Sequence, residues 1–125
     1  MKKILVFGGF GFLGYYLVHE LVKRDYKVTV ADINENEKLD SQITYIECDI
    51  TIKENVENVF ENNQFDVVYN LAGFANLDTA VKYPIDTMQL NVIGNMHILE
   101  QCVKNNVSRF VYASSAYAMS NKGSF

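Results

Sequence analysis

The fold is decided by one stretch near the N-terminus, Gly8-Gly9-Phe10-Gly11-Phe12-Leu13-Gly14. It follows an unbroken apolar run at residues 4–7, which is typical of a strand buried on both faces. Residues 12–24 then place apolar side chains at helical spacing. A glycine-rich turn between a buried strand and a helix is the arrangement in which backbone closely approaches a pyrophosphate.

The glycines of this turn match two related patterns. Gly8, Gly11 and Gly14 form G-x-x-G-x-x-G, and Gly9 replaces Gly8 in G-x-G-x-x-G. No G-K-[S/T] follows, which excludes a P-loop. Asp32 ends the next strand, eighteen residues after Gly14, where a carboxylate accepts hydrogen bonds from ribose hydroxyls and repels a 2′-phosphate. The pattern favours NAD over NADP, while an FAD-binding turn of the same kind stays open.

The rest of the chain alternates strands with helices. Further strands are predicted at residues 28–31, 44–48, 65–69 and 109–113. Thr51 and Glu54 have the spacing of a capping box for a helix through residue 60, and Pro84 suits the first turn of a long helix over residues 84–105. We therefore predict an α/β fold in one domain, residues 1–125: a Rossmann-type doubly wound parallel sheet in the order 3-2-1-4-5, truncated after the fifth strand.

Charge and composition limit the classes of partner, metal site and location that we expect for the chain. The formal net charge of −4 and the lack of basic blocks argue against nucleic acid. No apolar stretch is long enough to cross a membrane. Cys48 and Cys102 lie far apart without metal-ligand spacing, so we expect no metal site and two reduced thiols in a cytoplasmic protein.

Several motifs, in order, resemble the extended short-chain dehydrogenase/reductase family, the NAD-dependent epimerases and dehydratases of nucleotide sugars. The first is the glycine turn. Asp49-Ile50 follows the third strand, and Asn70-Leu71-Ala72-Gly73 follows the fourth. Pro84, Asn91 and Gly94 match P-x(6)-N-x-x-G, and residues 110–115 match F-V-Y-x-S-S. The resemblance covers all 125 residues.

The resemblance implies a nucleotide-sugar substrate, a homodimer formed through the 84–105 helix, and Asp49 and Ile50 against the adenine ring. Together with the glycine turn and Asp32, it gives these cofactor-binding residues: Gly8, Gly11, Phe12, Leu13, Gly14, Asp32, Ile33, Asp49, Ile50, Leu71, Ala72, Gly73 and Asn91. From residue type alone, Asn91 is expected to cap or brace backbone rather than to act in catalysis.

In the family, a Ser or Thr after the fifth strand binds the substrate hydroxyl, and Ser115 is the matching residue. The family's Y-x-x-x-K pair is absent, because Tyr112 is followed by Ala116 and Tyr117 by Asn121 at the Lys position. We therefore expect the chain to stop before this motif and to bind NAD without turnover. A non-catalytic NAD-responsive module remains the alternative.

Two histidines lie on predicted helices. His19 is expected at the surface, and His97 is expected to pack or to lie on a dimer face. The edge of a sheet truncated after its fifth strand exposes unpaired backbone groups, from which we expect a dimeric or aggregation-prone species.

Overall fold

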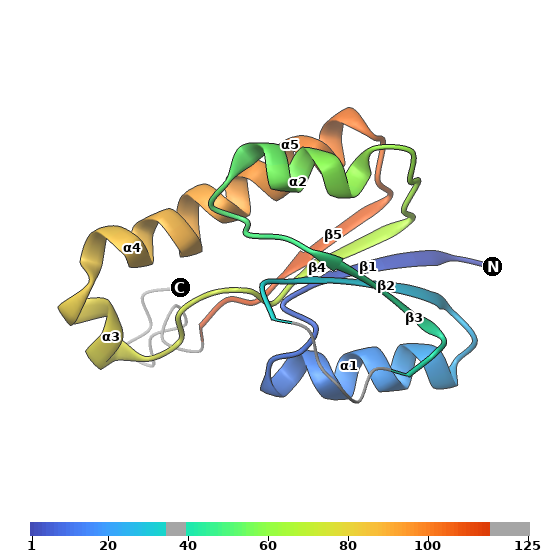
Figure 1. Ribbon diagram of the computed structural model, residues 1–125, viewed down its shortest axis with the longest axis horizontal. Helices are drawn as coiled ribbons and strands as arrows, with labels where there is room; N and C mark the ends of the chain where they lie inside the picture. The colour runs from blue at the N-terminus through green and yellow to red at the C-terminus, as the bar shows by residue number, and fades with distance from the viewer. Residues whose placement is uncertain (35–39, 116–125) are drawn as a thin grey trace, which may run out of the picture.

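The computed structural model describes residues 1–34 and 40–115 and contains one parallel sheet (Figure 1). Residues 35–39 and Tyr117 lie outside the described residues. The sheet has the order β3-β2-β1-β4-β5, as predicted. Its strands are β1 (Lys3–Phe7), β2 (Lys27–Asp32), β3 (Ile43–Glu47), β4 (Val67–Asn70) and β5 (Arg109–Tyr112).

Helices cover both faces of this sheet. Figure 1 shows α1 on one face and α2 and α5 on the other. The helical segments are α1 (Phe12–Lys23), α2 (Lys53–Phe60), α3 (Leu77–Lys82), α4 (Pro84–Met88), the π-helical η1 (Gln89–Gly94) and α5 (Asn95–Lys104). Among the helices of the described ranges, none combines the length and apolar character required to cross a membrane.

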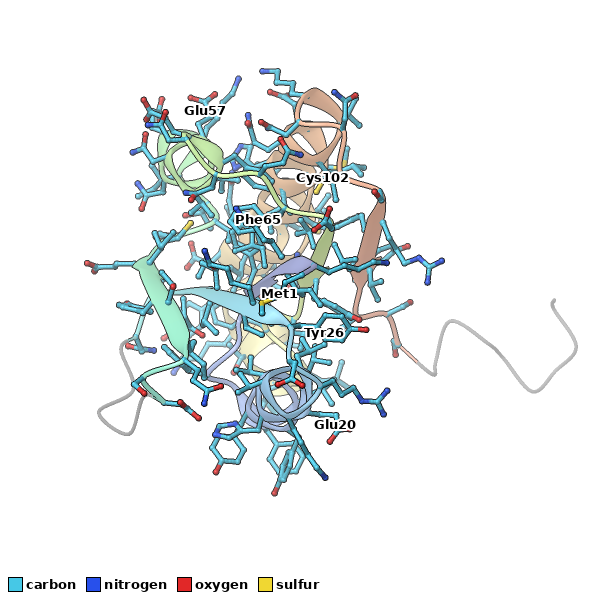
Figure 2. All side chains as sticks on the ribbon, turned by 90° about the vertical axis from the view of Figure 1, so that its right-hand side faces the viewer. Met1, Glu20, Tyr26, Glu57, Phe65 and Cys102 are labelled. Carbon is cyan, nitrogen blue, oxygen red and sulfur yellow. The ribbon has the colours of Figure 1, made fainter. Side chains whose placement is uncertain are left out.

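The alternation of side chains along β1 divides the core into two layers. Ile4 and Val6 pack with Val18 of α1, whereas Leu5 and Phe7 pack with residues of α2 and α5. All five side chains are almost completely buried. Figure 2 shows the two layers from the side, with Glu20 marking α1 on one face of the sheet and Glu57 marking α2 on the other. A strand with two buried faces needs no polar alternation, which explains the unbroken apolar run.

The predicted helix over residues 84–105 forms, but it is not a single regular α-helix. Pro84 occupies its first turn as predicted, and six residues in the middle, Gln89–Gly94, are π-helical. In this wider segment the Asn91 side chain bonds the backbone of Phe74 at 2.8 and 3.0 Å. Gly94, at the end of the same segment, lies close to Ile50, because a Cβ on it would be 2.6 Å from that side chain. The π turn is thus accompanied by two contacts, Asn91 with Phe74 and Gly94 with Ile50.

The prediction that Thr51 caps the second helix is wrong. Helix α2 begins at Lys53, its N-cap is Ile52, and no side chain caps it. The Thr51 hydroxyl and backbone N–H instead donate to the Asp49 carboxylate, at 2.7 and 2.9 Å. Thr51 therefore stands one residue before the N-cap, and its two bonds to Asp49 hold it in the turn that precedes the helix.

Helix α3 was not predicted, although its start carries a recognisable signal. Asn76 is the N-cap, and its side-chain oxygen accepts from the backbone N–H groups of Asp78 and Thr79 at 2.8 and 3.1 Å. Asn is among the preferred N-cap residues. The helix has only six residues and buries none of them, so no apolar periodicity marks it.

Candidate functional site

One pocket of about 640 Å³ opens where β1, β2, β3 and β4 end. This volume lies within the range of small-molecule sites, and ligands of open α/β sheets bind outside the carboxyl ends of the strands. The lining residues are Gly8, Phe10, Gly11, Ala31, Asp32, Ile33, Asn34, Cys48, Asp49, Ile50, Thr51, Leu71, Ala72, Gly73, Phe74, Asp86, Gln89 and Leu90.

Glycine is required in the first turn by space and by conformation. Gly8 has φ of +73°, and a Cβ there would lie 2.6 Å from the backbone nitrogen of Ala72. A Cβ on Gly14 would lie 2.7 Å from the Cα of Gly9 and closer still to the carbonyl oxygen of Gly8. Gly14 therefore lets α1 pack closely against the glycine turn. Gly11 differs, because a Cβ there would meet only the Gly8 oxygen, at 3.4 Å.

The start of α1 offers backbone N–H groups beside the pocket. Gly11 is its N-cap, no side chain caps the helix, and its first turn contains no acidic residue. The first N–H groups of a helix have no partner within the helix, and they carry the positive end of its dipole. Since Gly11 also lines the pocket, an anionic group of a ligand has a favourable position there.

The carboxylate of Asp32 is fixed in the pocket wall by two backbone amides. Its Oδ2 accepts from the N–H of Phe10 and its Oδ1 from the N–H of Asn34, both at 3.2 Å. The Tyr45 hydroxyl donates to the Asp32 carbonyl oxygen, also at 3.2 Å. A carboxylate has about four lone-pair positions, so Asp32 retains acceptor capacity for ligand hydroxyls.

Asp49 and Cys48 form the pocket wall after β3. Asp49 Oδ1 accepts both bonds from Thr51, and the Asp49 backbone N–H donates to Asn55 Oδ1 at 3.1 Å. Burial, assisted by the nearby charge of Asp49, raises the pKa of the Cys48 thiol to about 12. Cys48 therefore contributes an uncharged, unreactive surface at neutral pH.

The structure brings most of the predicted cofactor residues together. Nine of the thirteen line the pocket: Gly8, Gly11, Asp32, Ile33, Asp49, Ile50, Leu71, Ala72 and Gly73. Phe12 and Leu13 do not, and their side chains are 86% and 59% exposed on α1. Gly14 is buried behind the turn, and Asn91 also lies outside the lining.

Asn91 braces the backbone of the pocket rim, as its residue type predicts. Its Oδ1 accepts from the Phe74 N–H, and its Nδ2 donates to the Phe74 carbonyl. Gly73, one residue earlier, has φ of +159°, and a Cβ on it would lie 2.8 Å from Asn91 Oδ1. Asn91 thus shapes the pocket indirectly, through residues 73 and 74.

Asn70 provides a second brace that sequence reasoning did not assign. Its side chain is 5% exposed, donates to Asn95 Oδ1 at 2.8 Å and accepts from the Ala72 N–H at 3.0 Å. Its position in the motif at residues 70–73 was the available signal. The bridge fastens the turn after β4 to α5.

The predicted substrate-binding Ser115 lies beyond the end of β5, is exposed and does not line the pocket. His19 is exposed, as predicted, with Nδ1 2.7 Å from the Tyr15 carbonyl oxygen. His97 is half-buried, with Nδ1 2.8 Å from the Ile50 carbonyl oxygen, which confirms a packing role. Within residues 1–34 and 40–115, no cluster of three or more metal-ligating side chains occurs.

Half of the lining residues were not predicted: Phe10, Ala31, Asn34, Cys48, Thr51, Phe74, Asp86, Gln89 and Leu90. Phe10 occupies the variable position of the glycine motif, and five others, Ala31, Asn34, Cys48, Thr51 and Phe74, directly adjoin predicted residues that line the pocket. Asp86, Gln89 and Leu90 come from α4 and η1. No local pattern marks them, because their position depends on how the helix packs.

Comparison with known proteins agrees with this geometry. The profile of the NAD dependent epimerase/dehydratase family matches residues 4–124. A dTDP-D-glucose 4,6-dehydratase of Dictyostelium discoideum is 31% identical and is matched over 92% of this chain and 29% of its own length. A UDP-glucose 4-epimerase of Neisseria meningitidis serogroup C is 29% identical, over 98% of this chain and 39% of its own length.

Solved structures show the same relationship. The UDP-glucose 4-epimerase of Thermus thermophilus in complex with NAD superposes with a TM-score of 0.86 at 29% identity. The match covers 91% of this chain and 38% of that protein, so the chain spans little more than a third of its length. The Rossmann-type fold, the motifs and the family profile lead to one conclusion: the chain belongs to the NAD dependent epimerase/dehydratase family.

Proposed function

We propose that this chain binds NAD, with the diphosphate at the glycine turn and the adenosine ribose at Asp32. One observation carries the proposal: the uncapped start of α1 and the Asp32 carboxylate line the same pocket, each fixed by backbone contacts. Asp49 and Ile50 border the space assigned to the adenine. When bound, NAD supplies a hydride acceptor and donor, and the residues of this chain hold and orient it.

We further propose that residues 1–125 form the cofactor-binding unit of an epimerase or dehydratase of nucleotide sugars. The relatives named above are epimerases and a dehydratase of such sugars, and they extend well beyond the matched region. Ser115 is assigned to the substrate hydroxyl only where the Tyr and Lys of the family are present. Because these 125 residues contain no Y-x-x-x-K, the chain alone is expected to bind NAD without turnover.

Replacement of Gly11 by Val tests the NAD site. Gly11 has an extended backbone and open space at its Cβ, so the fold tolerates a side chain, which then fills the place of the diphosphate. Isothermal titration with NAD should show at least about a tenfold loss of affinity, or about 1.4 kcal/mol. Lys23→Ala, on the exposed part of the same helix, is the matched control and should bind like the unchanged chain.

Equal NAD affinity of the Gly11→Val and unchanged chains would refute the assignment of the diphosphate. A non-catalytic NAD-responsive module is the second candidate, because the same fold and pocket can hold a dinucleotide without turnover. The reading frame adjoining this sequence distinguishes the two. An in-frame Y-x-x-x-K supports the enzyme, whereas its absence, together with NAD binding and no conversion of UDP-glucose, supports the module.

We also propose that a second copy of the chain packs on the helical segment of residues 84–104. Ile85, Met88, Val92 and Met96 are 75%, 57%, 42% and 51% exposed and recur every three or four residues, which places them along one side of the helix. Sedimentation equilibrium should show a dimer that Ile85→Glu weakens. A monomer at all concentrations would exclude this interface.

The free thiols Cys48 and Cys102 fit the reducing cytoplasm, which we propose as the location.

A further inference from the structure

The wall of the pocket next to Asp32 is aromatic. Phe10 lines the pocket, and its ring contacts that of Tyr45 with a centroid distance of 5.5 Å. Tyr45 belongs to β3 and Phe10 to the turn after β1, so the pair spans the end of β2, where Asp32 lies. The backbone N–H of Phe10 and the hydroxyl of Tyr45 each donate to Asp32.

The charges around this wall have one sign. Asp32, Asp49 and Asp86 line the pocket, and among the lining residues that the structure describes there is no Lys, Arg or His. A phosphate dianion next to Asp32 would meet the Asp32 carboxylate and the Phe10 side chain, and none of the described lining residues offers it a cation. Placing a charge against apolar surface without a partner is costly.

We propose that Phe10, supported by Tyr45, is a specificity-determining residue that excludes a 2′-phosphate from the ribose site independently of the Asp32 charge. The inference rests on the proposed NAD site and adds a second barrier to it. Removing the Asp32 carboxylate eliminates the repulsion between charges, but the aromatic wall remains. Discrimination against NADP therefore persists in a variant that lacks only that charge.

The experiment compares NAD and NADP as ligands of four proteins: the unchanged chain, Phe10→Ala, Asp32→Asn and the double variant. Isothermal titration gives the ratio of the NADP and NAD dissociation constants for each. Phe10→Ala should lower this ratio by about tenfold or more in the Asp32→Asn background, the scale at which pockets discriminate by shape. Tyr16→Ala, an aromatic residue that is 61% exposed on α1, is the control and should leave the ratio unchanged.

The outcomes separate the inference from the proposed function. No NAD binding by the unchanged chain overturns both. If the unchanged chain binds NAD, but the ratio of the NADP and NAD dissociation constants is the same in Asp32→Asn and in the double variant, only the role of Phe10 is overturned. Phe10 also packs against the core, so Phe10→Leu is included as a milder change. If circular dichroism shows that the Phe10→Ala variant does not fold, Phe10→Leu replaces it in the Asp32→Asn background. An unchanged ratio of the NADP and NAD dissociation constants then counts against the inference, and a lowered ratio supports it.

Discussion

Gly14→Ala tests the close approach of α1 to the glycine turn, on which the shape of the pocket depends. A Cβ at this position would lie 2.7 Å from the Cα and 2.8 Å from the carbonyl carbon of Gly9. These are backbone atoms, and no change of rotamer moves them away. Either the helix or the turn must shift to accept the methyl group.

Two opposing effects set how much Gly14→Ala changes the free energy of unfolding. Replacing Gly by Ala inside a helix contributes about 0.8–1.0 kcal/mol of stability through helix propensity. Overpacking of a rigid contact costs about 1–3 kcal/mol, and the upper half of this range applies because the neighbours are backbone. We therefore expect a net loss of about 1–2 kcal/mol in the free energy of unfolding. For a domain of this size, the loss lowers the melting temperature by about 4–8 °C.

Thermal unfolding followed by circular dichroism measures this loss. Gly94→Ala provides a graded comparison, because its Cβ would meet Ile50 side-chain atoms, at 2.6 and 2.7 Å, rather than backbone. Side-chain atoms adjust more readily, so Gly94→Ala should destabilise the chain less. A Gly14→Ala protein as stable as the unchanged chain, or more stable, would refute the reasoning, since propensity alone predicts a gain.

Two further predictions concern the pocket rim and the thiols. Asn91→Leu removes both bonds to the Phe74 backbone and should cost about 1–2 kcal/mol in urea unfolding. An unchanged midpoint would exclude the bracing role. Burial raises the pKa values of Cys48 and Cys102 to about 12 and about 11, above the ordinary thiol value of 9.0. Because the unfolded thiols deprotonate first, the stability they contribute is complete below pH 9 and declines from pH 9 to 12. A denaturant midpoint independent of pH across this window, after correction for Tyr and Lys titration, would contradict this.

The strands and their order were predictable because two local features determine them. Solid apolar runs such as residues 4–7 have no alternative to a strand buried on both faces, and helices between them require right-handed crossovers. The glycine turn was predictable for a different reason. Gly8 has positive φ and Gly14 touches backbone, so any other residue is unfavourable at these positions and the glycines mark the turn in the sequence.

What could not be predicted depends on packing between distant segments. Asp86 lines the pocket through the packing of α4, and no residue near Asp86 in the sequence encodes that placement. The π turn arises where Asn91 reaches Phe74, seventeen residues away. Thr51 had the spacing of a cap, but it stands one residue before the N-cap and its hydroxyl donates to the Asp49 carboxylate. The contacts of Asp86 and Asn91 are visible only in three dimensions, whereas Asp49 is close to Thr51 in the sequence and was a local alternative to the cap.

The acidic lining of the pocket is compatible with an anionic dinucleotide because the charges are separated along the ligand. In the proposed mode, Asp32 and Asp49 face the ribose and the adenine, which are neutral, while the diphosphate lies at the start of α1. No cation occurs among the described lining residues, so what these residues offer the diphosphate is the N–H groups and the dipole at the start of α1. Backbone groups attract only at short range, so affinity requires the diphosphate to approach the turn closely. Side chains at residues 8, 11 and 14 would therefore weaken binding by increasing that distance or distorting the turn, even though none of them changes a charge.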